Sequence, residues 1–246
     1  MMKGNIPAEF QGIRAEIIDH RVWGTPANAL IISLPESRQA LSSRDGFRKA
    51  GLVCNCYLPK AVWPPLDENP SSWDDYLREV LKEAGRTPEE TTALSTGVNM
   101  ECLAWTKETF DELWVAAFVT AGVKTNAMRV GMDKASTIER LGVFDKVGTI
   151  NTVLLTGARL DLTALAASFI TITEAKNIAL QEMDVRSAFN PRWQATGTGT
   201  DQIVVVSGTG DECRYVGGHT KIGELMAKAV TAATIKAIRN GLEAKD

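Results

Sequence analysis

The chain has 246 residues, of which 44% are hydrophobic and 23% charged, and its formal net charge is −3. These proportions are those of an ordinary globular protein, and the slightly acidic balance excludes the clustered basic surface of a nucleic-acid-binding protein. No apolar run approaches the roughly 18 uninterrupted residues that a membrane-spanning helix needs. We therefore expect a cytoplasmic protein that binds neither a membrane nor nucleic acid.

The first part of the chain alternates apolar runs with polar loops. Residues 29–34 and 51–57 are rich in Leu, Ile, Val and Cys, which is typical of buried strands. The Pro-rich residues 59–72 predict a loop. Residues 73–84 then carry apolar side chains at helical spacing and are followed by Gly85, so this segment is predicted to be a helix.

The second part of the chain contains two long helical patterns, over residues 162–183 and from about residue 221 to 242. Both place apolar residues every three or four positions along one face. Short β-branched or aromatic runs before and between these patterns predict strands, of which the first two could pair as a hairpin. These strands are expected at residues 101–105, 113–119, 149–155 and 202–207.

No stretch of linker composition separates these elements, so we expect residues 1–246 to form a single domain. Its class is α/β or α+β, with a mixed, mostly buried β-sheet and two long helices packed on it. Small residues on the last helix would let it pack closely on the sheet or on a second subunit, which leaves a homo-oligomer open. These residues are Ala227, Ala229, Ala232, Ala233 and Ala237.

The cysteine and histidine content predicts neither a disulfide framework nor a metal site. Four cysteines are too few for a chain of this length, and only one residue separates Cys54 from Cys56, where zinc and redox motifs have two. The two histidines, His20 and His219, stand far apart. We expect reduced core cysteines, no metal and no cofactor.

Two polar residues stand out within the helical patterns. Lys176 falls on the apolar stripe of the first long helix, where it either covers apolar surface with its methylenes or pairs with a carboxylate. Glu174 lies on a neighbouring face. His219 follows two glycines at the entry to the last helix, a position that suits either a structural histidine or a general acid or base.

Four loops combine small hydroxyl or amide residues with glycine, including the stretch ATGTGTD at residues 195–201. A phosphate-binding loop follows a strand and opens a helix, but this stretch precedes a strand, so we disfavour that interpretation. Together the loops predict one pocket that offers uncharged hydrogen-bonding groups to a large neutral ligand. The candidate contacts are Ser42, Ser43, Thr96, Asn99, Asn126, Asn151, Thr198 and Thr200.

Seven segments, in order, are similar to the adenosylcobinamide amidohydrolase family. The resemblance spans nearly the whole chain except the Pro-rich stretch around residues 58–72 and the helix after it. The segments are ALSS (40–43), STGVNM (95–100), FVTAGVKTNAMRVGMD (118–133), GTINTVLL (148–155), ITITEAKNIALQEMDVRS (170–187), QATGTGTDQIVVVSGTG (194–210) and GGHTKIGELMAKAV (217–230).

The resemblance implies hydrolysis of the amide between the aminopropanol arm and the corrin ring, a reaction of corrinoid salvage that converts adenosylcobinamide to adenosylcobyric acid. The substrate itself carries the cobalt. Our mechanistic hypothesis makes His219 the general base, oriented by Asp201 or Glu224, and lets backbone N–H groups of the Thr-Gly loop stabilise the oxyanion. Lys176 with Glu174 would assist the leaving amine or position the carboxamide. A covalent route through Thr198 or Thr200 is an alternative that needs an activating partner. A non-hydrolytic corrinoid-binding protein, or an amidohydrolase for another macrocycle, also stays open.

Overall fold

The computed structural model describes residues 8–63, 72–83, 85, 87–135 and 149–244. The predicted loop over residues 59–72 therefore lies mostly outside the described residues, apart from a short 3-10 helix, η1 (Lys60–Val62).

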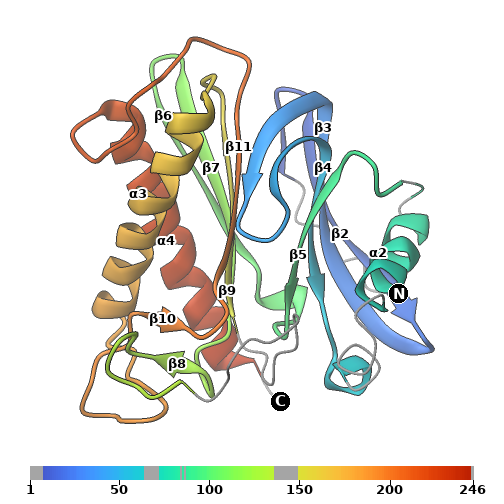
Figure 1. Cartoon of the computed structure of the whole chain (residues 1–246), viewed down its shortest axis with the longest axis vertical. Coiled ribbons are helices and arrows are strands. Elements are labelled where there is room, and N and C mark those ends of the chain that lie inside the picture. The colour runs from blue at the N-terminus through green and yellow to red at the C-terminus, as the bar shows by residue number, and fades with distance from the viewer. Residues whose placement is uncertain (1–7, 64–71, 84, 86, 136–148, 245–246) are drawn as a thin grey trace.

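Within these residues, nine strands form one curled, mixed sheet (Figure 1). Neighbouring strands are antiparallel except that β4 runs parallel to β5 and β9 parallel to β11. The order is β1-β2-β3-β11-β9-β7-β6, while β4 pairs with β3 and with β5. The strands are β1 (Ala8–Phe10), β2 (Ile13–Val22), β3 (Thr25–Ser42), β4 (Gly46–Tyr57), β5 (Thr91–Thr96), β6 (Ala104–Phe110), β7 (Leu113–Ala121), β9 (Ile150–Thr156) and β11 (Gln202–Val206).

The long strand β3 joins the two halves of this sheet. Its first part pairs with β2 and its last residues pair with β11, while β4 follows it through both parts. The register between β3 and β4 shifts between Ser33 and Arg38, around Pro35, which has no backbone N–H to donate to a ladder. This bulge lets the sheet curl, so that its two halves face each other.

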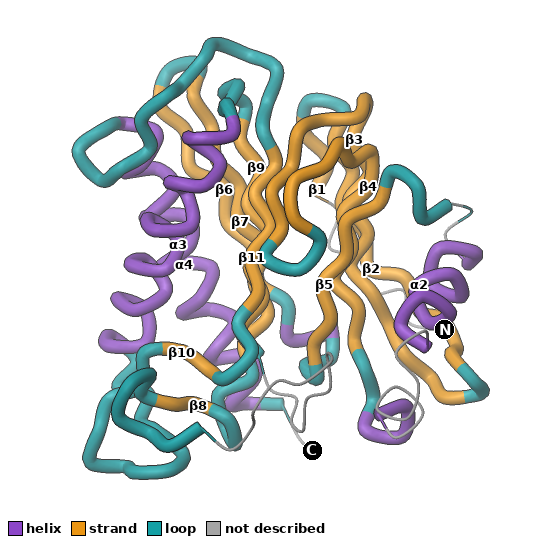
Figure 2. The backbone as a smooth tube through the Cα atoms, in the orientation of Figure 1, coloured by secondary structure: helices purple, strands orange, loops and turns teal. Residues whose placement is uncertain are grey.

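The curled sheet and its helices make four layers (Figure 2). Helix α2 (Ser72–Glu83) covers the outer face of one half, and helices α3 (Leu162–Glu182) and α4 (Lys221–Glu243) cover the outer face of the other. Apolar side chains also fill the space between the two halves of the sheet, where Leu30 and Leu94 meet Phe118 and Val204. Because β9 is covered on both faces, all seven of its residues are buried.

The structure confirms the α/β class, the mixed buried sheet and the two long helices. Each long helix begins at a capping side chain, since the Asp161 carboxylate accepts a hydrogen bond from the Ala164 N–H and the Thr220 hydroxyl accepts one from Gly223. The alanines of α4 pack on β6, β7 and α3, and Ala229, Ala233 and Ala237 are fully buried there.

The strand expected at residues 101–105 was wrong in its first half. Residues 100–102 form the 3-10 helix η2 (Met100–Cys102), and β6 begins only at Ala104. The Asn99 side chain caps this turn by accepting a hydrogen bond from the Glu101 N–H, which breaks the extended conformation. Strands β1, β2 and β5 were not predicted, because polar residues interrupt their apolar pattern.

Cysteine burial fits the expected role in the core. All four cysteines are free, and Cys54, Cys56 and Cys102 are buried. Burial raises the pKa of Cys56 to about 12, so its thiol stays protonated at neutral pH. Cys54 and Cys56 pack between β4 and α2 as small apolar groups.

Candidate active site

Lys176 and Asp201 form an ion pair where α3 passes the start of β11. The Lys176 Nζ lies 2.6 Å from the Asp201 Oδ2, and the two side chains are only 12% and 16% exposed. Lys176 therefore pairs with a carboxylate, one of the two interpretations that the apolar stripe left open. A pair this shielded from water keeps much of its electrostatic attraction, and loss of one partner would leave the other charge uncompensated.

Asp201 also ties three segments of the chain together. Its Oδ1 accepts hydrogen bonds from the backbone N–H of Ile150 at 3.0 Å and of Thr198 at 3.1 Å. The Thr198 hydroxyl donates to the same Oδ1 at 2.5 Å. The arrangement places a hydroxyl, a carboxylate and an ammonium group in series, in the order Thr198, Asp201, Lys176.

The stretch ATGTGTD builds this arrangement. Its residues Gly197–Thr198 form β10, which pairs with β8 (Ala127–Met128). A Cβ on Gly197 would lie 2.4 Å from the Asp201 Oδ2 and 2.8 Å from the Lys176 Nζ. Glycine at 197 is therefore what allows the ion pair to lie directly against the backbone.

We predict that Gly197→Ala lowers, by about a hundredfold, the kcat of the amide hydrolysis that the sequence resemblance implies. The new methyl group would displace the ion pair by about 1 Å. The atoms that it meets are the ends of flexible side chains, so the protein should still fold. Gly199→Ala is the matched control, since its Cβ would meet nothing closer than the Met128 Sδ at 3.7 Å. Steady-state kinetics and circular dichroism of both variants test this, and equal kcat values would contradict it.

A cluster of uncharged polar side chains, the Asn–Thr cluster (Asn55, Thr120, Thr149 and Asn151), lies next to the ion pair between the two halves of the sheet. The Asn151 Nδ2 donates to the Asn55 Oδ1 at 2.8 Å and to the Ser95 carbonyl at 2.9 Å. The Asn55 Nδ2 donates to the Thr120 Oγ1 at 3.0 Å. All four side chains of the cluster are buried.

The cluster joins the two halves of the sheet through its own hydrogen bonds. Asn151 is 0% exposed, and its amide group is engaged with the protein itself. The Thr149 Oγ1 lies 3.0 Å from the Asn151 Oδ1 and 2.5 Å from the Thr200 carbonyl oxygen, which links the cluster to the ATGTGTD loop. Asn151 was predicted to contact substrate, but the structure gives it a supporting position.

Three of the other predicted contact residues stabilise turns. Ser42, Thr96 and Asn99 each accept a hydrogen bond from a nearby backbone N–H, of Asp45, Val98 and Glu101 in that order. Ser43 instead accepts from the Ile203 N–H of β11. Asn126 lies beside the ATGTGTD loop, because a Cβ on Gly199 would be 3.8 Å from its side-chain amide. Asn126 and Thr200 remain partly exposed beside this loop, and Ser43 is exposed where it meets β11.

His219 is not brought to Asp201, contrary to our hypothesis. Asp201 bonds to Ile150, which pairs with Ala121, and the end of α4 at Gly241 lies against Ala121. His219 precedes the other end of α4, which at 23 residues is about 34 Å long. The histidine is exposed there, so the two groups lie at opposite ends of the molecule.

Glu224 and Glu174 also lie outside this constellation. Glu224 forms ion pairs with Lys221 and Lys228, each at 2.5 Å, and hydrogen bonds from these lysines lower its pKa to about 2. The Glu224 carboxylate is thus held by two lysines on the surface of α4, away from Asp201 and Lys176. Glu174 is exposed on α3, and Asp201, not Glu174, pairs with Lys176.

No sequence pattern assigned a site role to Asn55, Thr120, Arg44 or Trp73 individually. Asn55 carried a usable signal, since it interrupts an otherwise apolar strand and a buried amide needs partners. The Arg44 guanidinium lies 3.7 Å from the centre of the Trp73 ring and donates to the Ser95 Oγ at 3.2 Å. Arg44 and Trp73 are 29 residues apart, so no spacing could have connected them.

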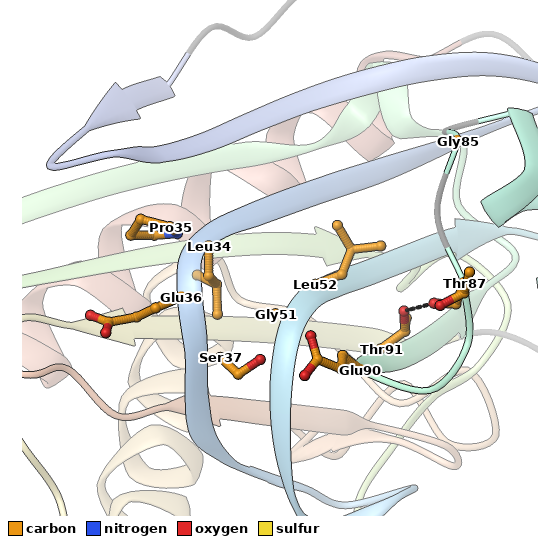
Figure 3. A pocket seen from close by; sticks show the side chains of 10 residues that line it. All are labelled: Leu34, Pro35, Glu36, Ser37, Gly51, Leu52, Gly85, Thr87, Glu90 and Thr91. Atoms are coloured by element: carbon orange, nitrogen blue, oxygen red, sulfur yellow. Dashed lines mark hydrogen bonds between the residues drawn. The ribbon is translucent and has the colours of Figure 1, made fainter.

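A cavity of about 470 Å³ opens on another part of the surface (Figure 3). It lies at the β3 bulge and the start of β5, and none of the predicted site residues lines it. The Glu90 carboxylate and the Ser37 hydroxyl both approach Gly51 there, at 3.2 and 3.4 Å from the position of a Cβ. Within the described residues, no group of three or more His, Cys, Asp or Glu side chains is placed to hold a metal ion.

None of the helices in the described part of the chain is both long and apolar enough to cross a membrane. The model of one family, described as adenosylcobinamide amidohydrolase, matches residues 14–246. An uncharacterized protein of Methanocaldococcus jannaschii is 44% identical over 220 residues, which cover 85% of each chain. A protein of Methanosarcina mazei named adenosylcobinamide amidohydrolase is 34% identical over 192 residues, 73% of this chain and 79% of the relative.

Among solved structures, a β-aminopeptidase from Burkholderia gives a TM-score of 0.46 at 12% identity, with 97% of this chain and 88% of that chain covered. An L-aminopeptidase D-Ala-esterase/amidase from Ochrobactrum anthropi gives 0.43 at 10% identity, with 94% and 82% covered.

Proposed function

Because the chain belongs to the adenosylcobinamide amidohydrolase family, we propose that it hydrolyses adenosylcobinamide to adenosylcobyric acid and aminopropanol. The family places it among hydrolases that act on amides. The specific substrate, and a place in corrinoid salvage, are part of the proposal. A corrinoid is large and carries a rim of neutral carboxamides, which hydroxyl, amide and backbone groups can bind without burying charge.

The observation that carries the proposal is the series Thr198–Asp201–Lys176. A nucleophile activated by a base, with the base oriented by a third group, is the general geometry of acyl transfer. Here the Thr198 hydroxyl donates to the Asp201 Oδ1 at 2.5 Å, and the Lys176 ammonium holds the Oδ2 at 2.6 Å. This geometry supports the covalent route, because the Asp201 carboxylate could act as the activating partner that Thr198 needs.

The first half of the proposed reaction forms an ester. The Thr198 Oγ attacks the amide carbonyl carbon while its proton passes to Asp201, and Lys176 stabilises the negative charge that develops on the carbonyl oxygen. The C–N bond then breaks, the proton moves from Asp201 to the leaving nitrogen, and aminopropanol departs. In the second half, water attacks the ester and gives one proton to Asp201. That proton returns to the Thr198 oxygen when the carboxylic acid leaves.

We predict that Thr198→Ala lowers kcat by at least about a hundredfold and that Thr198→Ser stays within about tenfold of the natural protein, since serine keeps the hydroxyl. Acid quenching during turnover, followed by mass spectrometry, should find the corrinoid acyl group on Thr198. An undiminished rate in Thr198→Ala would mean that water attacks the amide directly, and would contradict the covalent route.

The function itself is tested by incubating the purified protein with adenosylcobinamide and separating the products by chromatography. The proposal predicts adenosylcobyric acid and aminopropanol in equal amounts. A shifted corrinoid absorption spectrum without either product would identify a binding protein instead. A parallel incubation contains a non-corrinoid amide. Product from that amide alone would identify a different substrate.

A further inference from the structure

Arg44 occupies a rigid turn between β3 and β4. The Ser42 Oγ accepts hydrogen bonds from the Arg44 N–H at 3.2 Å and the Asp45 N–H at 3.1 Å. The Asp45 carboxylate in turn accepts from the Thr92 hydroxyl at 2.8 Å and from the Ala93 N–H at 3.0 Å. These bonds fasten the turn to β5 and fix the direction in which the Arg44 side chain leaves the backbone.

The guanidinium group rests on an aromatic support from α2. It lies 3.7 Å from the centre of the Trp73 ring, within the range of a cation–π interaction. Trp73 is itself stacked on Tyr76, with ring centres 5.6 Å apart, and Tyr76 is fully buried with its hydroxyl bonded to the Tyr57 carbonyl. The guanidinium thus rests on a Trp73 ring that is itself supported by the buried Tyr76.

Two steps of contact join Arg44 to the candidate active site. The Arg44 Nη1 donates to the Ser95 Oγ at 3.2 Å, and the Ser95 carbonyl accepts from Asn151 of the Asn–Thr cluster. The Ser95 N–H also donates to the Gln202 side chain at 3.2 Å, and Gln202 follows Asp201 in the chain. Arg44 therefore flanks the catalytic series on the side of β5.

The Arg44 guanidinium carries more N–H donors than the described residues engage. It carries five N–H donors, and among the described residues no carboxylate lies within ion-pair distance of it. Arg44 is exposed at the surface of this turn, so a ligand can reach its guanidinium. An acceptor oxygen supplied by that ligand would form a charge-assisted hydrogen bond with it.

We infer that Arg44, positioned by Trp73, binds carbonyl oxygens of the carboxamides on the rim of the substrate ring. The inference rests on the proposed function. It makes α2 a determinant of specificity, because Trp73 comes from the helix after the Pro-rich stretch, where the family resemblance in the sequence is interrupted. Arg44 touches the substrate, and Trp73 acts through Arg44.

The test is the steady-state kinetics of adenosylcobinamide hydrolysis by single and double variants. Arg44→Ala should raise KM by about tenfold or more and leave kcat within about threefold, because a charge-assisted hydrogen bond is lost far from the scissile amide. Arg44→Lys should not restore KM, since an ammonium lacks the planar fork that stacks on a ring. Trp73→Ala should raise KM, whereas Trp73→Phe should keep most of the affinity.

Trp23→Ala is the matched control. Trp23 also contacts Tyr76, with ring centres 6.3 Å apart, but it is 46% exposed and its ring contact is with Tyr76 and not with Arg44. Its KM should stay unchanged. In the double variant Arg44→Ala/Trp73→Ala, KM should be no higher than in Arg44→Ala alone, because both changes remove the same contact.

The two proposals fail in different ways. If the natural protein forms no adenosylcobyric acid, the proposed function is overturned. If it turns over but Arg44→Ala keeps the KM of the natural protein, the inference about Arg44 is overturned while the function stands. A Trp23→Ala variant with the same rise in KM as Trp73→Ala would mean that the aromatic group acts only through general stability.

Discussion

Asp201→Asn should lower kcat for adenosylcobinamide by about a hundredfold to a thousandfold. The substitution keeps the size of the side chain but removes the base that accepts the Thr198 proton. It also places an amide against the Lys176 ammonium, which now lies 2.6 Å from a carboxylate oxygen. The proton transfer is therefore lost, and Lys176 is no longer held in position by a charged partner to stabilise the oxyanion.

Glu212→Gln is the control for this experiment, because Glu212 also forms an ion pair, with Arg159 at 3.0 Å, but on the exposed surface. Its kcat should stay within about twofold of the natural protein, since exposed pairs contribute little. Circular dichroism should show both variants folded. A folded Asp201→Asn variant with an unchanged kcat would remove Asp201 from the mechanism.

Gly208→Ala should lower the free energy of unfolding by about 3 kcal/mol, at the upper end of the usual cost of overpacking. A Cβ at this position would lie 2.0 Å from the Gly157 carbonyl oxygen and 2.5 Å from that of Thr156. Both are backbone atoms, so relief requires that the segments after β9 and β11 move apart. The Gly208 N–H would then lose its hydrogen bond to the Ala158 carbonyl, now 2.7 Å long.

The matched control is Gly218→Ala, because nothing lies within 4 Å of a Cβ at that position. Its free energy of unfolding should stay within about 0.5 kcal/mol of the natural protein. Urea denaturation followed by circular dichroism measures both variants. Equal stability of the two would show that the close approach at Gly208 is not maintained in solution.

The parts of the fold that follow from local periodicity could be predicted. Helices α3 and α4 and strand β9 carry long, regular apolar patterns, and their predicted bounds differ from the structure by at most one residue at either end. Strand β5 could not be found in this way, because its buried residues include Thr91, Thr92 and Thr96 and its position depends on parallel pairing with β4.

In the candidate site, too, local patterns could not identify contacts between residues far apart in the chain. Lys176 stood out because a charge on an apolar helix face needs an explanation, but the helix alone could not identify Asp201 as its partner, 25 residues away. His219 was given a partner that it does not meet, because a pattern of elements does not tell which end of the sheet each loop reaches. Only the topology places Asp201 and His219 at opposite ends of α4.

The ATGTGTD stretch at residues 195–201 was predicted to be a loop, but its contacts could not be predicted from composition. Its residues were predicted to line a pocket for a neutral ligand. In the structure, Gly197 lets the ion pair lie against the main chain. The loop positions Thr198 and Asp201, whereas the neutral Asn–Thr cluster behind them is buried and joins the two halves of the sheet.

The most direct test of where the chemistry occurs is a side-by-side measurement of initial rates for Asp201→Asn and His219→Ala. Adenosylcobinamide is the substrate, and adenosylcobyric acid is quantified by chromatography. We expect a rate at least about a hundredfold below that of the natural protein for Asp201→Asn, and a rate within about threefold of it for His219→Ala. Loss of turnover in His219→Ala, with turnover retained in Asp201→Asn, would contradict the assignment of the active site to the Lys176–Asp201 pair.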